Sequence, residues 1–121
     1  MTAKLYEYGP CSTCKKAIKF LNAKGIKFTK IAIVDQPPTV KELNQMVAIL
    51  NDQGKSFKHL FNTSGVQYRE LKIGQKLKDG LSEPDALKLL ASNGKLIKRP
   101  FLLTEKSGLI GFNESEWSKL F

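Results

Sequence analysis

Residues 4–34, KLYEYGPCSTCKKAIKFLNAKGIKFTKIAIV, carry the strongest structural signal in the chain. Lys4–Tyr8 predicts a short strand, which Gly9 and Pro10 end. The next segment predicts an amphipathic helix over about residues 12–24, because apolar residues recur there at helical spacing, at Cys14, Ala17, Ile18 and Leu21. Residues 26–34 predict a second strand. Strand, helix and strand within roughly 30 residues indicate a βαβ unit with parallel strands.

The middle of the chain, residues 39–93, predicts helices rather than strands. Thr39 and Glu42 have the spacing of a capping box, so we expect a helix to begin there, with Leu43, Met46, Val47 and Leu50 on its apolar face together with Val40. Short helical pieces are expected near residues 56–61 and 66–72. Ser82, followed by Pro84, predicts the start of another helix that runs to about Ser92.

The last part of the chain predicts a hairpin and one more helix. Residues 101–104 and 109–110 are the two strands, joined by a turn at 105–108. A final helix should follow Asn113 and bury Trp117, Leu120 and Phe121. The element order is therefore βαβ, helical insert, ββα. We expect one domain over residues 1–121, with a core formed by 1–34 and 95–121 and an insert at 39–93.

Composition excludes several classes of protein. The 121 residues are 41% hydrophobic and 26% charged, which is typical of a folded globular chain and not of a disordered one. No apolar run approaches the ~18 residues of a membrane helix, and the first residues lack the apolar stretch of a signal peptide, so we expect a cytoplasmic protein. We also expect a monomer, because the predicted site needs no second subunit.

The net charge of +9 is the unusual bulk property. Eighteen of the twenty basic residues are lysines, which favours a solvated surface over a nucleic acid interface, where arginine forks dominate. Residues 1–34 alone hold seven lysines and one glutamate. This local excess is suited to an anionic thiol substrate or to an acidic protein partner.

The two cysteines, Cys11 and Cys14, form one C-x-x-C at the junction of the first strand and its helix. Cys11 would lie at the helix N-terminus, where free amides and the helix dipole favour a thiolate. Cys14 would lie one turn further, on the apolar face. This asymmetry predicts that Cys11 attacks a disulfide and that Cys14 resolves the mixed disulfide.

Three other interpretations of the cysteine pair remain open. A zinc site needs four ligands, and the chain offers only His59 beyond the two cysteines. Cys14 could be an ordinary core residue, or both cysteines could be incidental. We expect no metal and no bound cofactor.

Three groups of residues, in this order, resemble the arsenate reductase (ArsC)/Spx family of thioredoxin-like proteins. They are residues 6–17 (YEYGPCSTCKKA), 61–65 with 68–71 (FNTSG and YREL), and 98–103 with 111–113 (KRPFLL and GFN). The resemblance implies an α/β thioredoxin-like fold with a four-stranded mixed sheet. It also implies a cis proline at Pro100, facing the catalytic cysteine, and a role for Arg99 in stabilising the Cys11 thiolate or binding an anion. Ser12, Thr13, Arg99 and Pro100 are the expected substrate-binding residues.

Two departures from the family pattern shape the functional prediction. The resemblance implies arginines at positions 64 and 112 in arsenate reductases, and this chain has Ser64 and Phe112 there. We therefore expect a thiol–disulfide oxidoreductase that acts on a disulfide or glutathionylated substrate, with glutathione or another thiol as co-substrate. Arsenate reduction is one alternative. The other is an Spx-type regulator that binds the RNA polymerase α subunit and uses the cysteine pair as a redox switch.

Overall fold

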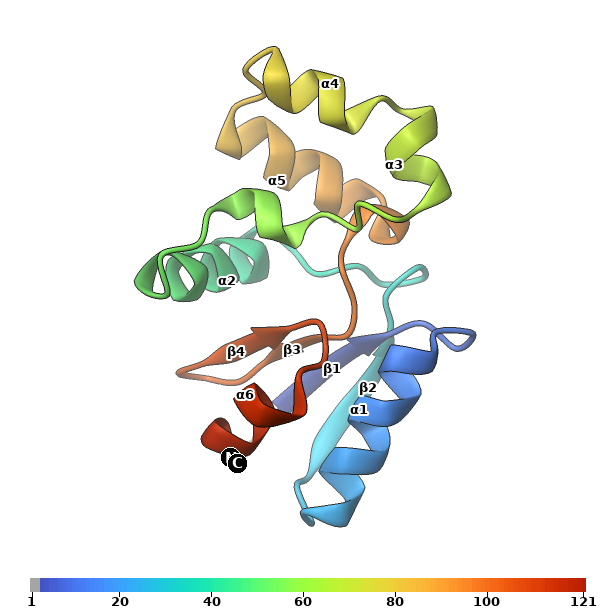
Figure 1. The fold of residues 1–121 in the computed structure, drawn as a ribbon, viewed down its shortest axis with the longest axis vertical. Coiled ribbons are helices and arrows are strands. Elements are labelled where there is room, and N and C mark those ends of the chain that lie inside the picture. Colours follow the sequence, from blue (N-terminus) through green and yellow to red (C-terminus); the bar gives the residue numbers. More distant parts are fainter. Residues whose placement is uncertain (1–2) are drawn as a thin grey trace.

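Four strands, β1 (Ala3–Glu7), β2 (Phe28–Ala32), β3 (Phe101–Leu103) and β4 (Gly108–Ile110), form one sheet in the order β2-β1-β3-β4. The computed structural model describes residues 3–121, and residues 1 and 2 of the predicted domain lie outside the described residues. β1 is parallel to β2 and antiparallel to β3, and β3 is antiparallel to β4. The predicted four-stranded mixed sheet is therefore confirmed (Figure 1).

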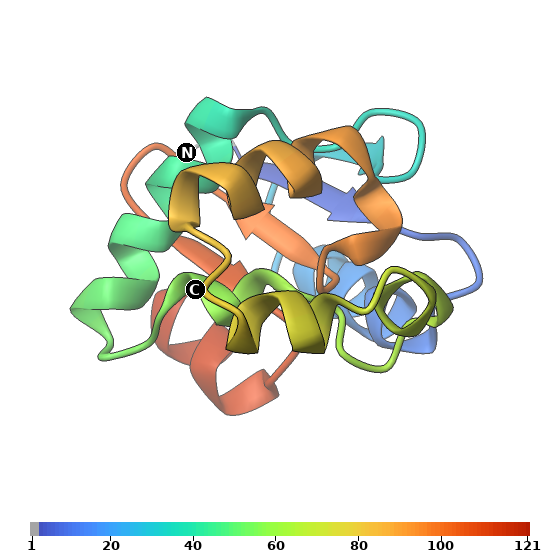
Figure 2. The same cartoon turned by 90° about the horizontal axis from the view of Figure 1, so that it is seen from above.

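Helices cover both faces of this sheet. They are α1 (Ser12–Ala23), α2 (Val40–Asp52), α3 (Val66–Glu70), α4 (Ile73–Lys78), α5 (Glu83–Ser92) and α6 (Glu114–Leu120), with the one-turn 3₁₀ helices η1 (Phe57–Leu60) and η2 (Gly94–Leu96). Figure 1 shows α2–α5 on one side of the sheet and α1 and α6 on the other, and Figure 2 shows the first group lying over the strands. Within residues 3–121, no helix combines the length and the apolarity that a membrane span requires.

Two apolar clusters, one on each face of the sheet, follow the alternation of side chains along the strands. Tyr6 and Phe101 point toward α2 and α5, and their rings meet edge to face with centroids 5.6 Å apart. Leu5 and Leu102 point the other way, toward α1 and Trp117. Trp117 is fully buried, and its Nε1 donates to the carbonyl of Gly111 at 3.1 Å.

The short helix expected near residues 66–72 is confirmed as α3, but one further helix was not predicted and one detail of the last helix was wrong. The structure divides the region after residue 66 into α3 and α4, with Lys72 in the left-handed conformation between them (φ 53°). The sequence did not predict α4, because its six residues bury only Ile73 fully and include a glycine. At the C-terminal end only Trp117 is fully buried, whereas Leu120, the last residue of α6, and Phe121, its C-cap, are partly buried.

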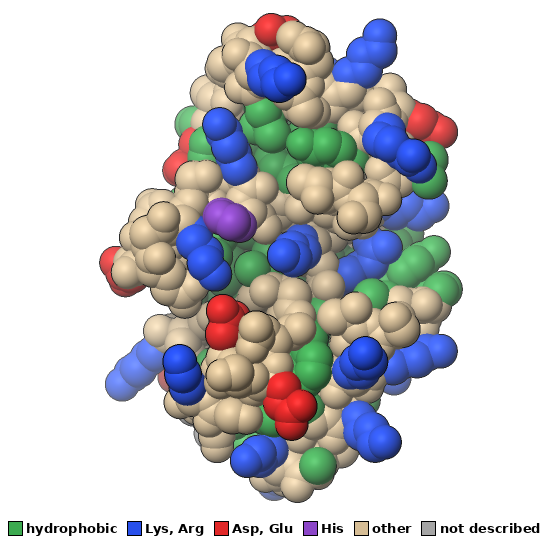
Figure 3. Space-filling model, viewed as in Figure 1, with side chains coloured by type: hydrophobic (Ala, Val, Ile, Leu, Met, Phe, Trp, Pro, Cys, Tyr) green, Lys and Arg blue, Asp and Glu red, His purple; other side chains and the backbone are tan. Residues whose placement is uncertain are grey.

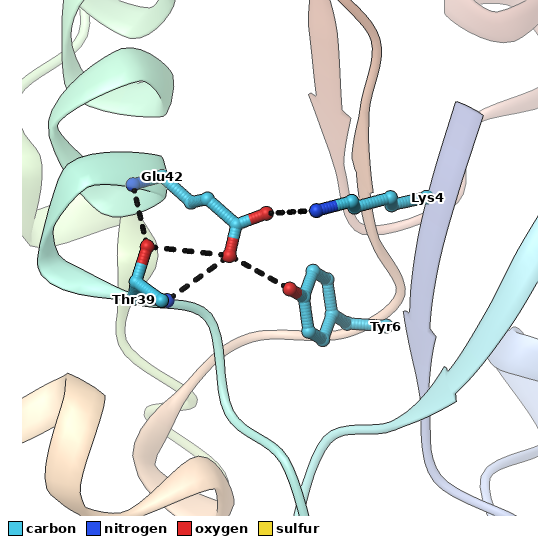
Figure 4. Close-up of polar contacts among 4 residues, drawn as sticks. All are labelled: Lys4, Tyr6, Thr39 and Glu42. Carbon is cyan, nitrogen blue, oxygen red and sulfur yellow. Dashed lines mark hydrogen bonds and ion pairs between the residues drawn. The ribbon is translucent and has the colours of Figure 1, made fainter. Parts of the chain in front are cut away.

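The capping box predicted at Thr39 is confirmed, and it also joins α2 to the sheet (Figure 4). Glu42 Oε1 accepts from the Thr39 amide at 3.1 Å and from the Tyr6 hydroxyl at 2.8 Å, while Lys4 Nζ lies 3.3 Å from Oε2. Burial alone would raise the pKa of Glu42, but the donors from Thr39, Tyr6 and Lys4 hold this pKa below its usual value. The carboxylate is thus ionised and links β1 to the N-terminus of α2.

Candidate active site

Cys11 is the N-cap residue of α1, placed there by the turn that follows β1. Its amide donates to the Tyr8 carbonyl at 2.9 Å, and its backbone is extended (φ −76°, ψ 114°). Its Sγ accepts a hydrogen bond from the amide of Cys14 at 3.4 Å. A sulfur in this position faces the free amides of the first helical turn, which favour a negative charge.

The two thiols have opposite electrostatic environments. Burial alone would raise the pKa of Cys11, but hydrogen bonds from the Cys14 thiol and from the amides of Cys14 and Thr13, together with the charge of Arg99, lower this pKa below its ordinary value. Cys14 is fully buried, and burial raises the pKa of its thiol to about 12. Cys11 is therefore the group that ionises first, and Cys14 stays protonated beside it.

Arg99 is the cation that acts directly on the two thiols. It precedes Pro100 through a cis peptide bond, as the family resemblance implied, and its guanidinium lies 4.5 Å from the centre of the Tyr8 ring. Its Nη1 is buried and has no hydrogen-bond partner within residues 3–121. A buried donor left without a partner is costly, so this N–H is available for an anion that enters the site.

A hollow of about 500 Å³ opens in front of Cys11. Its walls come from three distant parts of the chain: Cys11, Thr13, Lys55, Asn62, Lys98, Arg99, Ile110, Gly111, Phe112, Asn113 and Glu116. Three of these residues are cations and one, Glu116, is a carboxylate, which lies 4.0 Å from Lys55 Nζ. The charge around the thiol therefore favours an anionic ligand.

The hollow contains three of the six predicted site residues, namely Cys11, Thr13 and Arg99. Ser12 is exposed and does not line it, while Cys14 and Pro100 are buried and do not line it either. Substrate contacts by Ser12 and Pro100 stay predictions. Sequence reasoning assigned no role to Asn62 and Lys98, although both lie in the segments that carried the family resemblance.

Phe112 forms an apolar wall of the hollow where the resemblance implied an arginine. Its ring packs against Phe20 and Trp117, with centroids 5.8 and 5.1 Å away. Ser64 does not line this hollow, and Arg99 is the arginine that does. Because each charge-assisted hydrogen bond contributes roughly 1.5–3 kcal/mol, one arginine should hold a tetrahedral oxyanion much less tightly than three.

The described part of the chain contains no set of side chains that could bind a metal ion. Within residues 3–121, no group of three or more His, Cys, Asp or Glu side chains could hold a metal ion.

Replacement of Arg99 by alanine is expected to make Cys11 less reactive at neutral pH. Arg99 stabilises the thiolate, so its removal should raise the pKa of Cys11 and move the midpoint of thiol alkylation to higher pH. The pH profile of iodoacetamide labelling, read by mass spectrometry, measures this midpoint. Arg69→Ala, an exposed arginine on α3, is the matched control and should leave it unchanged. An unmoved midpoint in Arg99→Ala would contradict the assignment.

Comparisons with known proteins match nearly the whole chain. The model of the ArsC family matches residues 6–120. The uncharacterised protein YusI of Bacillus subtilis is 40% identical over 119 residues, which are 98% of each chain. The global transcriptional regulator Spx of Enterococcus faecalis is 30% identical and is matched over 93% of this chain and 80% of its own. The crystal structure of an ArsC-family-related protein from Bacteroides fragilis superposes with a TM-score of 0.90 at 45% identity, covering 100% of this chain and 98% of the other.

Proposed function

The chain belongs to the ArsC family, and we propose that it is a thiol–disulfide oxidoreductase with Cys11 as nucleophile and Cys14 as resolving cysteine. The observation that carries the proposal is the placement of the two thiols: Cys11 is the N-cap of α1 at the edge of the hollow, with its Sγ accepting from the Cys14 amide, and Cys14 is fully buried beside it. The pKa shifts, lowered at Cys11 and raised at Cys14, agree with this placement. The attacking sulfur needs to be an exposed thiolate, and the resolving thiol needs to stay protonated until the first step is over.

The reaction proceeds in two exchanges. The Cys11 thiolate attacks one sulfur of a substrate disulfide, R–S–S–R′, so that a Cys11–S–S–R bond forms and R′–S⁻ leaves and takes up a proton. Cys14 then loses its proton and attacks the Cys11 sulfur, which releases the second thiolate, R–S⁻, and leaves the Cys11–Cys14 disulfide. Two electrons have passed from the protein to the substrate.

Regeneration requires an external thiol. Two molecules of glutathione or of another thiol reduce the Cys11–Cys14 disulfide and leave as their own disulfide, so no resident cofactor takes part. The substrate class is a small disulfide or a glutathionylated protein, and the cations around Cys11 support an anionic one. We place this activity in a cytoplasmic monomer.

A second candidate function is supported by the 30% identity to a protein named as the transcriptional regulator Spx. The same cysteine pair would then act as a switch whose oxidation changes the binding of RNA polymerase. A pull-down with the C-terminal domain of the polymerase α subunit under oxidising and reducing conditions separates the candidates. Binding that follows the redox state supports the regulator, and no binding in either state removes it.

The equilibrium between the dithiol and the disulfide tests the proposed function first. We expect Cys11 and Cys14 to close reversibly in glutathione buffers, with a midpoint in the cytosolic range of roughly −220 to −320 mV. Alkylation of the remaining thiols followed by mass spectrometry measures the oxidised fraction. A pair that never closes, or that forms only a glutathione adduct on Cys11, would exclude the two-cysteine mechanism and leave monothiol chemistry.

A further inference from the structure

A second hollow, of about 240 Å³, adjoins the one in front of Cys11. It is lined by Lys58, His59, Phe61, Asn62, Thr63, Ser64 and Lys98. Asn62 and Lys98 also line the first hollow, so these two side chains border both spaces. The Lys98 side chain passes over Gly111, where an added Cβ would lie 3.0 Å from its Cε.

The second hollow has the composition of an anion site. Two lysines and a histidine line it together with two hydroxyl groups, and its lining includes no carboxylate. Within residues 3–121, neither Lys58 nor Lys98 forms an ion pair, and the amides of Thr63 and Ser64 have no backbone acceptor. Figure 3 shows the histidine side chain, in purple, on the surface with basic side chains on both sides of it. The two lysines and these two amides are therefore without ion-pair or backbone partners in the described part of the chain.

The volume of the second hollow indicates how much of a ligand it can hold. Sites for whole small molecules usually measure about 300–1,000 Å³, so a hollow of about 240 Å³ is better suited to one group of a larger ligand. Because Asn62 and Lys98 border both hollows, a ligand that extends past these two side chains would also occupy the space in front of Cys11. Its reactive sulfur would then lie at Cys11 and a second polar group beyond Lys98.

We propose that the second hollow is a carboxylate subsite, and that the small substrate is a disulfide of an elongated thiol with two separated carboxylates, as in glutathione. One carboxylate lies near Arg99, beside the reacting sulfur. The other lies among Lys58, His59 and the amides of Thr63 and Ser64. This inference rests on the proposed oxidoreductase function and adds the residues that select the substrate.

Binding of a ligand that cannot react with Cys11 tests the subsite separately from the proposed function. S-Methylglutathione has both carboxylates and no thiol, so it can bind to the full chain but cannot react. Titration followed by amide NMR should move the Thr63 and Ser64 signals as well as those around Cys11. Lys58→Ala, which removes one charge-assisted contact, and Ser64→Asp, which adds a repelling carboxylate, should each weaken the affinity by about tenfold or more. The matched controls, Lys78→Ala on α4 and Ser118→Asp on α6, are exposed and line neither hollow, and should bind as the natural chain does.

The kinetics of disulfide reduction provide the second test of the subsite. Lys58→Ala should raise KM for oxidised glutathione by a larger factor than KM for bis(2-hydroxyethyl) disulfide, which carries no charge. The subsite would be overturned if only the amide NMR signals around Cys11 shifted, or if the two control variants lost as much affinity for S-methylglutathione. This holds even if the chain reduces oxidised glutathione. Conversely, shifts at Thr63 and Ser64 in a chain that reduces neither disulfide would support the subsite and overturn the oxidoreductase function alone.

Discussion

Replacement of Cys11 by serine is expected to reduce disulfide turnover by roughly 10³-fold or more, as loss of the nucleophile does in other covalent mechanisms. A serine hydroxyl is a weak nucleophile at neutral pH, whereas the pKa of Cys11 is lowered by its hydrogen bonds and by Arg99 despite its partial burial. Reduction of oxidised glutathione, coupled to an external thiol, measures the loss. Turnover close to that of the natural chain would exclude Cys11 as the attacking group.

Replacement of Cys14 by serine is the matched control, because it changes the same pair by one atom. Serine can still donate a hydrogen bond toward Cys11, so the attacking thiolate should persist while the resolving step is lost. The variant should accumulate a mixed disulfide on Cys11, seen as an increase in mass that a reductant removes. If the variant does not accumulate this species and still reduces the disulfide at the rate of the natural chain, Cys14 is a core residue and the chain acts through a single thiol.

The positions of the two cysteines, Cys11 at the N-terminus of α1 and Cys14 buried, could be predicted from the sequence because the geometry is local. Three residues separate Cys11 from Cys14, so the helix that the apolar spacing predicts also determines which thiol is exposed and which is buried. The same locality explains the confirmed capping box at Thr39, whose partners lie three residues apart. Local spacing and hydrophobic period are properties that a single sequence displays.

The hollow could not be predicted in the same way, because tertiary packing assembles it. Lys55 comes from the loop after α2, Asn62 follows η1, and Lys98 precedes β3. An antiparallel bridge between Phe61 and Ile97, with the Lys98 amide donating to the Leu60 carbonyl at 2.7 Å, brings the last two together. Neither bridging segment forms an extended strand, so the pairing had no periodic signal in the sequence.

Gly94 begins the segment that leads to the bridge between Ile97 and Phe61. Its replacement by alanine is expected to destabilise the fold strongly. Gly94 is buried at the start of η2, where the chain leaves α5 and returns to the sheet. An added Cβ would overlap the carbonyl oxygen of Ile33 and lie 2.7 Å from its carbonyl carbon and 3.2 Å from Val34 Cα. All three contacts are backbone atoms, so no change of rotamer can relieve them.

The contacts around Gly94 leave little room for the backbone to shift. Ile33 is fully buried, and its amide donates to the Glu7 carbonyl at 2.9 Å, while the Asn62 amide donates to the Leu96 carbonyl at 2.7 Å. We therefore expect Gly94→Ala to lower the free energy of unfolding by about 3 kcal/mol, the upper end of the cost of overpacking. For a domain of this size the midpoint of thermal unfolding should fall by about 10 °C. Urea and thermal unfolding followed by circular dichroism measure both.

Gly74→Ala is the control that separates steric overlap from a general effect of replacing glycine. Gly74 lies within α4, and an added Cβ would meet only the Tyr68 side chain, at 3.5 Å or more, so alanine there should be neutral or stabilise the chain by up to about 1 kcal/mol. Since η2 leads directly to Lys98 and Arg99, a Gly94→Ala chain that still folds should also show an altered pH profile of Cys11 alkylation. Unchanged stability together with an unchanged profile would mean that residues 93–97 move away from Ile33 and Val34 at no cost, and that Arg99 is held at the thiol by β3 alone.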